Sequence, residues 1–213
     1  TAYEIPKRDW SSDVCSSDLN AVMRYLINSG EWNDSSKLSV VHYAIECPQR
    51  NPRKVRNSSD EVSFLSISRL VEQKSIPILL RAFKIHSQTF PNDTLTIVGS
   101  GNKEKSYKRL ARNMQLNDNL TWAGRVANVE TFYQSSDVFI LASKYEGFGL
   151  VLLEAMCAHI AIIASNVSSI PEVLGGEHKG LFKTGNELNL VNLMKLARDP
   201  KFRDAIISQQ DKI

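Results

Sequence analysis

The chain has 213 residues, of which 42% are hydrophobic and 23% charged, so it holds enough apolar side chains for a sizeable core. Its net charge of +3 fits an anionic ligand or an anionic membrane surface. No block of lysine and arginine interleaved with aromatic residues occurs, which argues against a nucleic-acid partner. No apolar stretch reaches the roughly 20 residues of a membrane span. Cys47 and Cys157 lack metal-like spacing, so we expect reduced thiols.

Residues 9–19 are set apart from the rest of the chain. They read Asp-Trp-Ser-Ser-Asp-Val-Cys-Ser-Ser-Asp-Leu, in which the doubled Ser-Ser-Asp has no structural periodicity. The segment resembles the conceptual translation of a sequencing adapter, and a genuine polar linker is the alternative. We therefore interpret residues 1–19 as a non-native segment, exclude it as one would a fusion scar, and predict one domain over residues 20–213. Without the three aspartates of residues 9–19, the net charge becomes +6.

Strands and helices alternate along the remaining chain. The periodicity of apolar residues predicts these elements. In chain order they are strands at 38–43 and 62–67, a helix at 77–89, a strand at 94–98, a helix at 103–114, a strand at 120–123, a helix at 129–134, a strand at 138–141, a helix at 150–156, a strand at 161–164, a helical turn at 171–174, a strand at 180–183, and helices at 186–198 and 201–210. Helices between strands predict an α/β fold with a doubly wound parallel sheet, Rossmann-like, whose ligands bind beyond the carboxyl ends of the strands.

The turn after residues 62–67 carries two cations, Arg69 and Lys74. Two positive charges at the end of a buried strand could hold a pyrophosphate without a metal ion. An ordinary solvated turn with basic residues is the alternative. The next turn, Val98-Gly99-Ser100-Gly101, lacks the third glycine of the dinucleotide fingerprint, which disfavours a nicotinamide cofactor. Gly99 could instead let a ligand or a neighbouring loop come close.

The third turn places one glutamate on each side of a helix start. Glu146 precedes Gly147 and Gly149, and Glu154 lies inside the apolar helix at 150–156. Glycines at a helix start expose backbone N–H groups that favour an anion. Because helical side chains lean toward the N-terminus, Glu154 can point back at the same ligand. Phosphate pairs with amides and hydroxyls pair with carboxylates, so a sugar nucleotide suits this segment. An exposed acid is the alternative for Glu154, disfavoured by its apolar neighbours.

Other candidate residues are weaker. Arg125 and Val126 follow the strand at 120–123 and could contact a nucleobase, or they form a simple turn. His86 is expected on a helix surface. None of the four histidines has a second ligand at metal spacing, so we expect no metal.

Three segments together resemble the C-terminal, donor-binding half of family 4 glycosyltransferases, which have the two-domain GT-B fold. The resemblance covers about residues 20–203 and is closest to bacterial enzymes of surface-polysaccharide assembly. The segments that carry it are Ser68-Arg69-Leu70-Val71-Glu72-Gln73-Lys74, Leu95-Thr96-Ile97-Val98-Gly99-Ser100-Gly101, and Glu146 to Glu154 with Ala155-Met156.

The resemblance implies a retaining transfer of a hexosyl group from a nucleoside-diphosphate sugar to a glycan or lipid-linked acceptor. By position, Arg69 and Lys74 would stabilise the charge on the departing diphosphate, and Glu146 would contact the donor sugar. Glu154 would accept hydrogen bonds from the ribose hydroxyls. The other donor-binding positions that the resemblance implies are Gly99, Arg125, Val126, Gly147, Phe148, Gly149, Leu150 and Val151.

The resemblance also implies what surrounds this half of the enzyme. No metal or other cofactor is expected, and the acceptor would bind through an N-terminal domain outside this chain, so we expect the chain alone to be inactive. The family suggests a cytoplasmic location at the inner face of the cytoplasmic membrane, with peripheral membrane association. Two alternatives stay open: a nucleotide-sugar epimerase of GT-B fold and a non-catalytic nucleotide-sugar-binding module.

Overall fold

The computed structural model describes residues 15–17, 28, 38–40, 61–116 and 118–213, in two compact units, Thr1–Ala44 and Ile45–Ile213. In the first unit, β1 (Cys15–Ser17) pairs in parallel with β2 (Leu38–Val40). β1 lies in the segment that we set aside, and β2 is the start of the strand expected at 38–43. β2 pairs with β1 rather than with the main sheet, because strand pairing is decided by contacts that periodicity does not encode. Residues 41–43 lie outside the described part.

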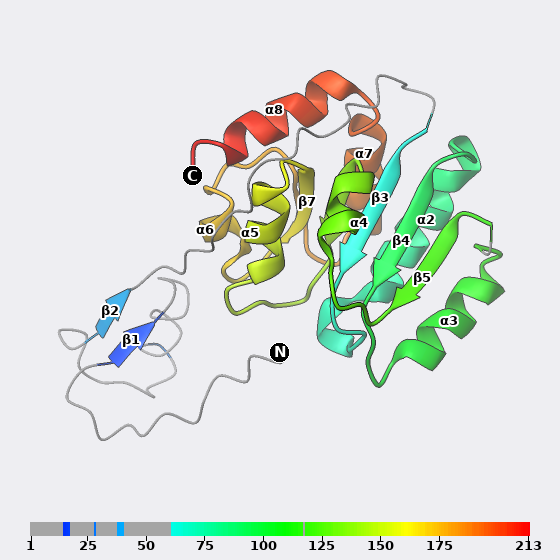
Figure 1. Ribbon diagram of the computed structural model, residues 1–213, viewed down its shortest axis with the longest axis horizontal. Helices are drawn as coiled ribbons and strands as arrows, with labels where there is room; N and C mark the ends of the chain where they lie inside the picture. The colour runs from blue at the N-terminus through cyan, green and yellow to red at the C-terminus, as the bar shows by residue number, and fades with distance from the viewer. Residues whose placement is uncertain (1–14, 18–27, 29–37, 41–60, 117) are drawn as a thin grey trace. The chain divides into compact units, whose positions relative to one another are not determined.

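The second unit is built on one parallel six-stranded sheet (Figure 1). Its strand order is β5-β4-β3-β6-β7-β8, so the order reverses between β3 and β6. Ligands of such sheets bind in the crevice beyond the carboxyl ends at this reversal. The predicted Rossmann-like α/β fold is therefore confirmed. The strands are β3 (Ser63–Ile67), β4 (Thr94–Val98), β5 (Leu120–Gly124), β6 (Val138–Leu141), β7 (Ala161–Asn166) and β8 (Leu181–Lys183).

Helices cover both faces of this sheet. Figure 1 shows α4 and α5 in front of it and α2 and α7 behind it, where α2 contacts α7. Their bounds agree closely with the prediction, but the 3₁₀ helix η2 (Glu72–Lys74) was not predicted. The helices are α2 (Ile76–Thr89), α3 (Glu104–Asn113), α4 (Glu130–Ser135), α5 (Leu150–Cys157), α6 (Ile170–Val173), α7 (Glu187–Leu196) and α8 (Pro200–Gln210).

The core lies on both sides of the central strands. All four residues of β6 are buried, as are the first five of β7. Continuous apolar runs of this kind are typical of parallel strands that are covered on both faces. On one face Phe64 meets Phe83 of α2 edge to face, with 6.3 Å between ring centroids. Burial of these strands fixes the positions of their carboxyl ends. The loops that follow therefore start from fixed positions.

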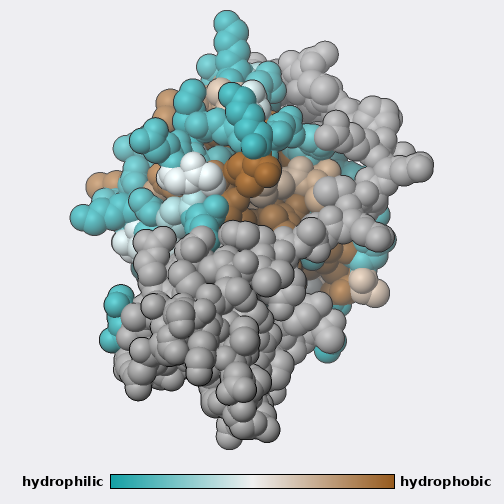
Figure 2. Space-filling model, turned by 90° about the vertical axis from the view of Figure 1, so that its left-hand side faces the viewer, coloured by the Kyte–Doolittle hydropathy of each residue, from teal (hydrophilic) through white to brown (hydrophobic). Residues whose placement is uncertain are grey.

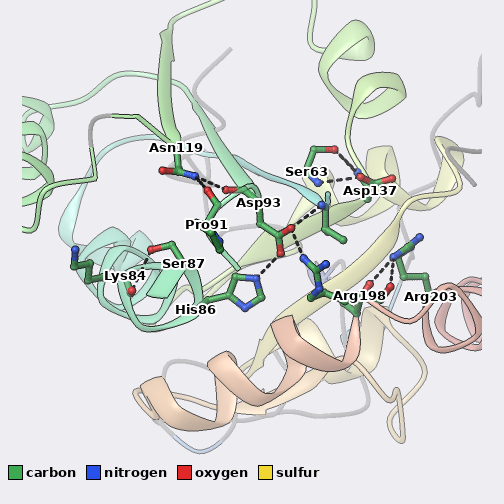
Figure 3. Close-up of polar contacts among 12 residues, drawn as sticks. Ser63, Lys84, His86, Ser87, Pro91, Asp93, Asn119, Asp137, Arg198 and Arg203 are labelled. Atoms are coloured by element: carbon green, nitrogen blue, oxygen red, sulfur yellow. Dashed lines mark hydrogen bonds and ion pairs between the residues drawn. The ribbon is translucent and has the colours of Figure 1, made fainter. Parts of the chain in front are cut away.

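The carboxylate of Asp93, just before β4, connects the start of β3 with helix α2 and with Arg198 (Figure 3). Its Oδ1 accepts a hydrogen bond from the backbone N–H of Val62, at 2.9 Å, and pairs with the guanidinium of Arg198. Its Oδ2 lies 2.7 Å from Nε2 of His86. His86 is fully buried, so its expected surface position was wrong. The reason is that Asp93, seven residues away, supplies the polar partner that a buried imidazole needs.

Helix α5 keeps much of its apolar surface only partly buried. Leu150, Val151, Leu153 and Met156 are all part-exposed. Figure 2 views the molecule from the side of α5 and α6 and shows hydrophobic residues gathered near its middle.

Cys157, which ends α5, is disulfide-bonded, so the expected reduced thiol was wrong. Sequence spacing does not tell which cysteines approach in space. Among the described helices, none is both long and apolar enough to cross a membrane.

Candidate functional site

The loop after β3 packs directly on the glycine turn after β4. The N–H of Leu70 donates to the carbonyl of Ser100 at 2.9 Å, and the N–H of Lys103 donates to the carbonyl of Leu70 at 3.0 Å. Gly99 has φ +128°, and a Cβ atom there would lie 1.9 Å from the carbonyl oxygen of Ser68. Of the two reasons considered for Gly99, close approach of the neighbouring loop is therefore present in the structure. A role of Gly99 in donor binding stays a prediction.

Lys74 and Glu146, two of the predicted catalytic residues, form an ion pair. Lys74 Nζ lies 2.5 Å from Glu146 Oε1, and the side chains are only 12% and 5% exposed. The hydroxyl of Ser143 donates to the same carboxylate oxygen, and that of Ser169 donates to the Glu146 carbonyl at 3.3 Å. A shielded ion pair with further hydrogen bonds holds both charges in a defined position. The structure thus joins residues that are 72 positions apart in the chain.

Gln73, which the sequence did not single out, connects η2 to the loop after β6 at the level of the backbone. Its carbonyl accepts the N–H of Lys144 at 2.8 Å, and its side-chain amide donates to the carbonyl of Tyr145 at 2.9 Å. Gln73 directly precedes Lys74, and Lys144 and Tyr145 directly precede Glu146, so these two bonds lie beside the ion pair in the sequence. They fix the spacing of the two segments, so the ion pair does not depend on flexible side chains alone.

The remaining predicted cations are exposed. Arg69 follows β3 by two residues; its carbonyl accepts the N–H of Val71 at 3.0 Å, but its side chain makes no hydrogen bond or ion pair within the described part of the chain. Arg125 is also exposed and follows β5, while Val126 is part-exposed. The N–H of Gly99 donates to the carbonyl of Gly124 at 2.7 Å, which places the start of the Arg125 loop beside the end of β4. The turns after β3, β4 and β5 therefore lie together at the carboxyl edge of the sheet.

The start of α5 presents backbone amides at the same edge. Gly149 is its N-cap with φ +77°, a conformation that favours glycine, and no side chain caps the helix. The first N–H groups of an α-helix have no partner inside it, so those of Leu150 and Val151 can meet a ligand. A Cβ atom on Gly147 would meet nothing within 4 Å, whereas Phe148 is only 9% exposed. Phe148 therefore anchors the loop while Gly147 borders open space.

Glu154 lies behind this helix start and is held by Tyr133 of α4. The Tyr133 hydroxyl is 3.0 Å from Glu154 Oε2 and 3.1 Å from the carbonyl oxygen of Val151. Tyr133 is 2% exposed, and burial, with the nearby negative charge of Glu154, raises its pKa far above the ordinary value. Sequence reasoning missed Tyr133. The available signal was weak: a buried tyrosine usually needs a hydroxyl partner, but the sequence does not say which.

Within the described residues, no group of three or more His, Cys, Asp or Glu side chains could hold a metal ion. Lys74 and Arg69 follow β3 at this edge of the sheet and carry positive charge. The arrangement suits an anion that carries hydroxyl groups, since amides and cations face phosphate oxygens and carboxylates accept from hydroxyls.

Comparison with known proteins agrees with this geometry. The model of the family "Glycosyl transferases group 1" matches residues 49–212. An uncharacterized glycosyltransferase of Haemophilus influenzae is 30% identical over 141 residues, which are 64% of this chain and 39% of the relative. The capsular polysaccharide biosynthesis glycosyltransferase CapM of Staphylococcus aureus is 31% identical over 151 residues, 66% of this chain and 38% of that protein.

The fold is also found in solved structures. That of Anabaena HepE in complex with UDP and glucose has a TM-score of 0.79 and 20% identity, over 94% of this chain and 58% of that one. The chain spans about two-fifths of the length of the curated relatives named above. The likeness is to one half of the GT-B architecture, as the sequence predicted. Since the family match includes the whole six-stranded sheet and every loop of the site, the chain belongs to the glycosyl transferases of group 1.

Proposed function

We propose that this chain is the donor-binding half of a retaining glycosyltransferase, which transfers a hexosyl group from a nucleoside-diphosphate sugar to a glycan or lipid-linked acceptor. The observation that carries the proposal is the convergence at one sheet edge of the Lys74–Glu146 pair and the α5 amides, with Glu154 behind them. Each group suits one part of such a donor. The cations and amides can bind the diphosphate, and the carboxylates can accept hydrogen bonds from the hydroxyl groups.

In this proposal the diphosphate lies on the amides of Leu150 and Val151, with Lys74 and Arg69 beside it. The bond between the sugar carbon C1 and the diphosphate oxygen breaks, and C1 bonds to the oxygen of an acceptor hydroxyl on the same face. The proton of that hydroxyl passes to the departing diphosphate. The negative charge that develops on the departing diphosphate is stabilised by preorganised cations. Lys74 is already held by Glu146, so it needs little reorientation. No metal is needed, because Lys74, Arg69 and the helix start supply the positive charge.

Glu154 would accept hydrogen bonds from the ribose of the donor. Tyr133 occupies Oε2 of its carboxylate, and within the described residues Oε1 has no hydrogen-bond partner. One oxygen is thus positioned and the other is left to accept ribose hydroxyls. Glu146, held by Ser143 and Lys74, would meet the hydroxyls of the donor sugar.

Three finer features belong to the same proposal. We propose uracil as the base, because the solved HepE structure contains UDP and has the same fold. The name of the CapM relative supports an acceptor in polysaccharide assembly. We place the enzyme in the cytoplasm at the inner membrane face, with the acceptor bound by a further domain of the parent protein.

The test is calorimetric titration of the 213-residue chain with UDP, GDP and ADP, with EDTA present. We expect UDP to bind, and Glu154→Gln to weaken binding by about 1–3 kcal/mol, the cost of a lost hydrogen bond to a charged group. Glu61→Gln is the matched control, because Glu61 is exposed and precedes β3 at the opposite edge of the sheet. This control should leave the affinity unchanged.

Three results would contradict the proposal or a part of it. If a folded chain bound none of the three diphosphates, the donor site would not be here, and a non-catalytic role of the domain would be favoured. If UDP bound only when Mg²⁺ replaced EDTA, the metal-free part of the proposal would be wrong. Equal weakening by Glu154→Gln and Glu61→Gln would show a general charge effect rather than a ribose contact.

A further inference from the structure

A pocket of about 390 Å³ opens beside η2, and none of the predicted donor-site residues lines it. Four segments form its wall: η2, the first turns of α2, the start of α3 and the loop after β6. Glu72 and Lys144 line this pocket, whereas their neighbours Lys74 and Glu146 form the ion pair of the donor site. The two sites are therefore separate but share the same two segments.

The charge of the pocket is mainly positive. Lys103, Lys144 and Arg81 line it, against the single carboxylate of Glu72. Glu72 lies 2.8 Å from Lys144, and this contact, followed by the charge of Lys103, lowers the pKa of Glu72 below its ordinary value. Arg81 pairs with Glu187, which does not line the pocket. Lys103 makes no ion pair within the described residues, so two lysines share the single carboxylate of Glu72.

Ser75 adds a buried hydroxyl group to the wall. Its residue is 4% exposed, and its Oγ has no hydrogen-bond partner in the described part of the chain. Ser75 is the N-cap of α2, a position where a hydroxyl usually accepts a backbone N–H, but here it makes no such bond. Pro77 has no N–H, and the N–H of Ile78 donates to the Ser75 carbonyl at 2.9 Å. The hydroxyl is therefore buried in the wall and keeps a donor that no described residue uses.

Ser75 also has a left-handed backbone, with φ 48° and ψ 36°. Non-glycine residues adopt this region rarely, and such residues concentrate at ligand sites and switch regions. Buried hydroxyls without a partner are also rare in native structures. The left-handed backbone is accounted for by the position of Ser75 at the C-cap of η2. The buried hydroxyl without a partner is the feature that a bound ligand with acceptor oxygens would explain.

We propose that this pocket binds a phosphate group carried by a small molecule or by a lipid headgroup. Phosphate oxygens would accept from the ammonium groups of Lys103 and Lys144 and from the Ser75 hydroxyl. Pro77 and Tyr107 give the pocket an apolar wall for the group that carries the phosphate. The volume lies in the range of small-molecule sites. Binding requires that phosphate compete with Glu72 for Lys144.

The experiment measures binding of inorganic phosphate and glucose 6-phosphate to the whole chain by calorimetry, with saturating UDP present to occupy the donor site. We expect Lys103→Met and Lys144→Met each to weaken the affinity for glucose 6-phosphate by about tenfold, as for a lost charged hydrogen bond. Glu72→Gln should strengthen it several-fold, because the competing carboxylate is removed. Opposite signs from neighbouring positions would not arise from a loss of folding.

Lys105→Met is the control. Lys105 is exposed on α3, two residues from Lys103, and does not line the pocket. It removes the same charge from the same helix and should leave the affinity within about twofold, since exposed charges are screened by salt. Ser75→Ala should weaken binding less than the lysine variants. The affinity of each variant for UDP, measured alone, separates this site from the donor site.

Flotation with phosphatidylcholine vesicles that do or do not contain phosphatidylglycerol identifies the source of the phosphate. Flotation that requires phosphatidylglycerol and is lost in Lys103→Met and Lys144→Met, but not in Lys105→Met, assigns the pocket to a lipid headgroup. Glucose 6-phosphate binding without such flotation assigns it to a soluble phosphate ester. The proposal is overturned if the chain binds neither glucose 6-phosphate nor vesicles with phosphatidylglycerol. It is also overturned if Lys103→Met, Lys144→Met and Glu72→Gln bind as the unchanged chain does.

Discussion

Tyr133 shows how one hydroxyl group can position a predicted ligand-binding residue. Its ring is buried against Phe139 of β6, with 5.6 Å between ring centroids, so the side chain has little freedom. From this fixed ring the hydroxyl reaches Oε2 of Glu154 and the carbonyl of Val151. The carboxylate is thereby held beside the first turn of α5. A glutamate on a flexible side chain would otherwise lose rotamer freedom when it binds a ligand.

At the residue scale we predict that Tyr133→Phe lowers both stability and affinity for UDP. Loss of the hydroxyl should reduce the free energy of unfolding by about 1 kcal/mol, the typical net value of a hydrogen bond. Affinity for UDP should fall about fivefold, because Glu154 must be ordered at the moment of binding. Urea denaturation and calorimetry measure the two effects.

The double variant Tyr133→Phe, Glu154→Gln distinguishes positioning from general damage. If Tyr133 acts through Glu154, its removal should cost little further affinity once Glu154 is already changed, since coupled residues are not additive. Fully additive losses of affinity would show that Tyr133 acts independently of Glu154.

At the scale of elements, the loop after β3 is placed by two glycines of the turn after β4. A Cβ on Gly101 would lie 2.4 Å from the carbonyl oxygen of Leu70, and one on Gly99 would lie even closer to Ser68. These are backbone atoms, which cannot move aside as a flexible side chain can. The absence of two side chains thus lets the segment that carries Arg69 and Lys74 lie on the end of β4.

We predict that Gly99→Ala destabilises the protein by about 3 kcal/mol, because the new methyl group overlaps a backbone carbonyl and the positive φ disfavours alanine. Thermal unfolding followed by circular dichroism measures this effect.

Gly147→Ala is the comparison, since its Cβ would meet nothing within 4 Å. It should change stability by less than about 0.5 kcal/mol, as surface substitutions usually do. If both variants were equally stable, the packing role of Gly99 would be wrong.

At the scale of the whole second unit, Asp93 joins elements that are remote in sequence. Its carboxylate links the start of β3, helix α2 through His86, and the segment between α7 and α8 through Arg198 (Figure 3). Burial alone would raise the pKa of Asp93, but hydrogen bonds from His86, Arg198 and the N–H of Val62 hold it below the ordinary value. The charged form is therefore the one that stabilises the fold.

The sign of the pH dependence follows from this lowered pKa. The unfolded chain binds a proton at Asp93 more readily than the folded one, so the stabilisation is complete above about pH 4. It is lost as the pH falls through the lower pKa of the folded state. We expect Asp93→Asn to lower the free energy of unfolding at pH 7 by about 3 kcal/mol, because Arg198 loses its buried partner. The variant should also lose less stability on acidification.

Urea denaturation between about pH 7 and pH 3 measures both effects. Asp204→Asn, at an exposed position of α8, is the control and should follow the unchanged protein at every pH. If Asp93→Asn lost as much stability in acid as the unchanged protein, the lowered pKa of Asp93 would not contribute to its acid sensitivity.

The sequence by itself determined most elements and the residue types of the site. β4 and β6 have the predicted bounds, because apolar periodicity is a local property that neighbouring residues share. The glycines and acids around Glu146 and Glu154 could be interpreted for the same reason: helix-start chemistry depends on a few consecutive residues. The parallel arrangement followed from the alternation of strands and helices.

Only the tertiary structure decided which remote groups meet. The Lys74–Glu146 pair, the Tyr133–Glu154 hydrogen bond and the burial of His86 each depend on partners that a local pattern does not name. η2 is held by bonds from Gln73 to the loop after β6, so three residues with weak local preference become a helix through tertiary contacts. Strand order likewise follows from the packing of the whole sheet. Local periodicity thus specifies elements, whereas long-range packing specifies the partners that turn them into a site.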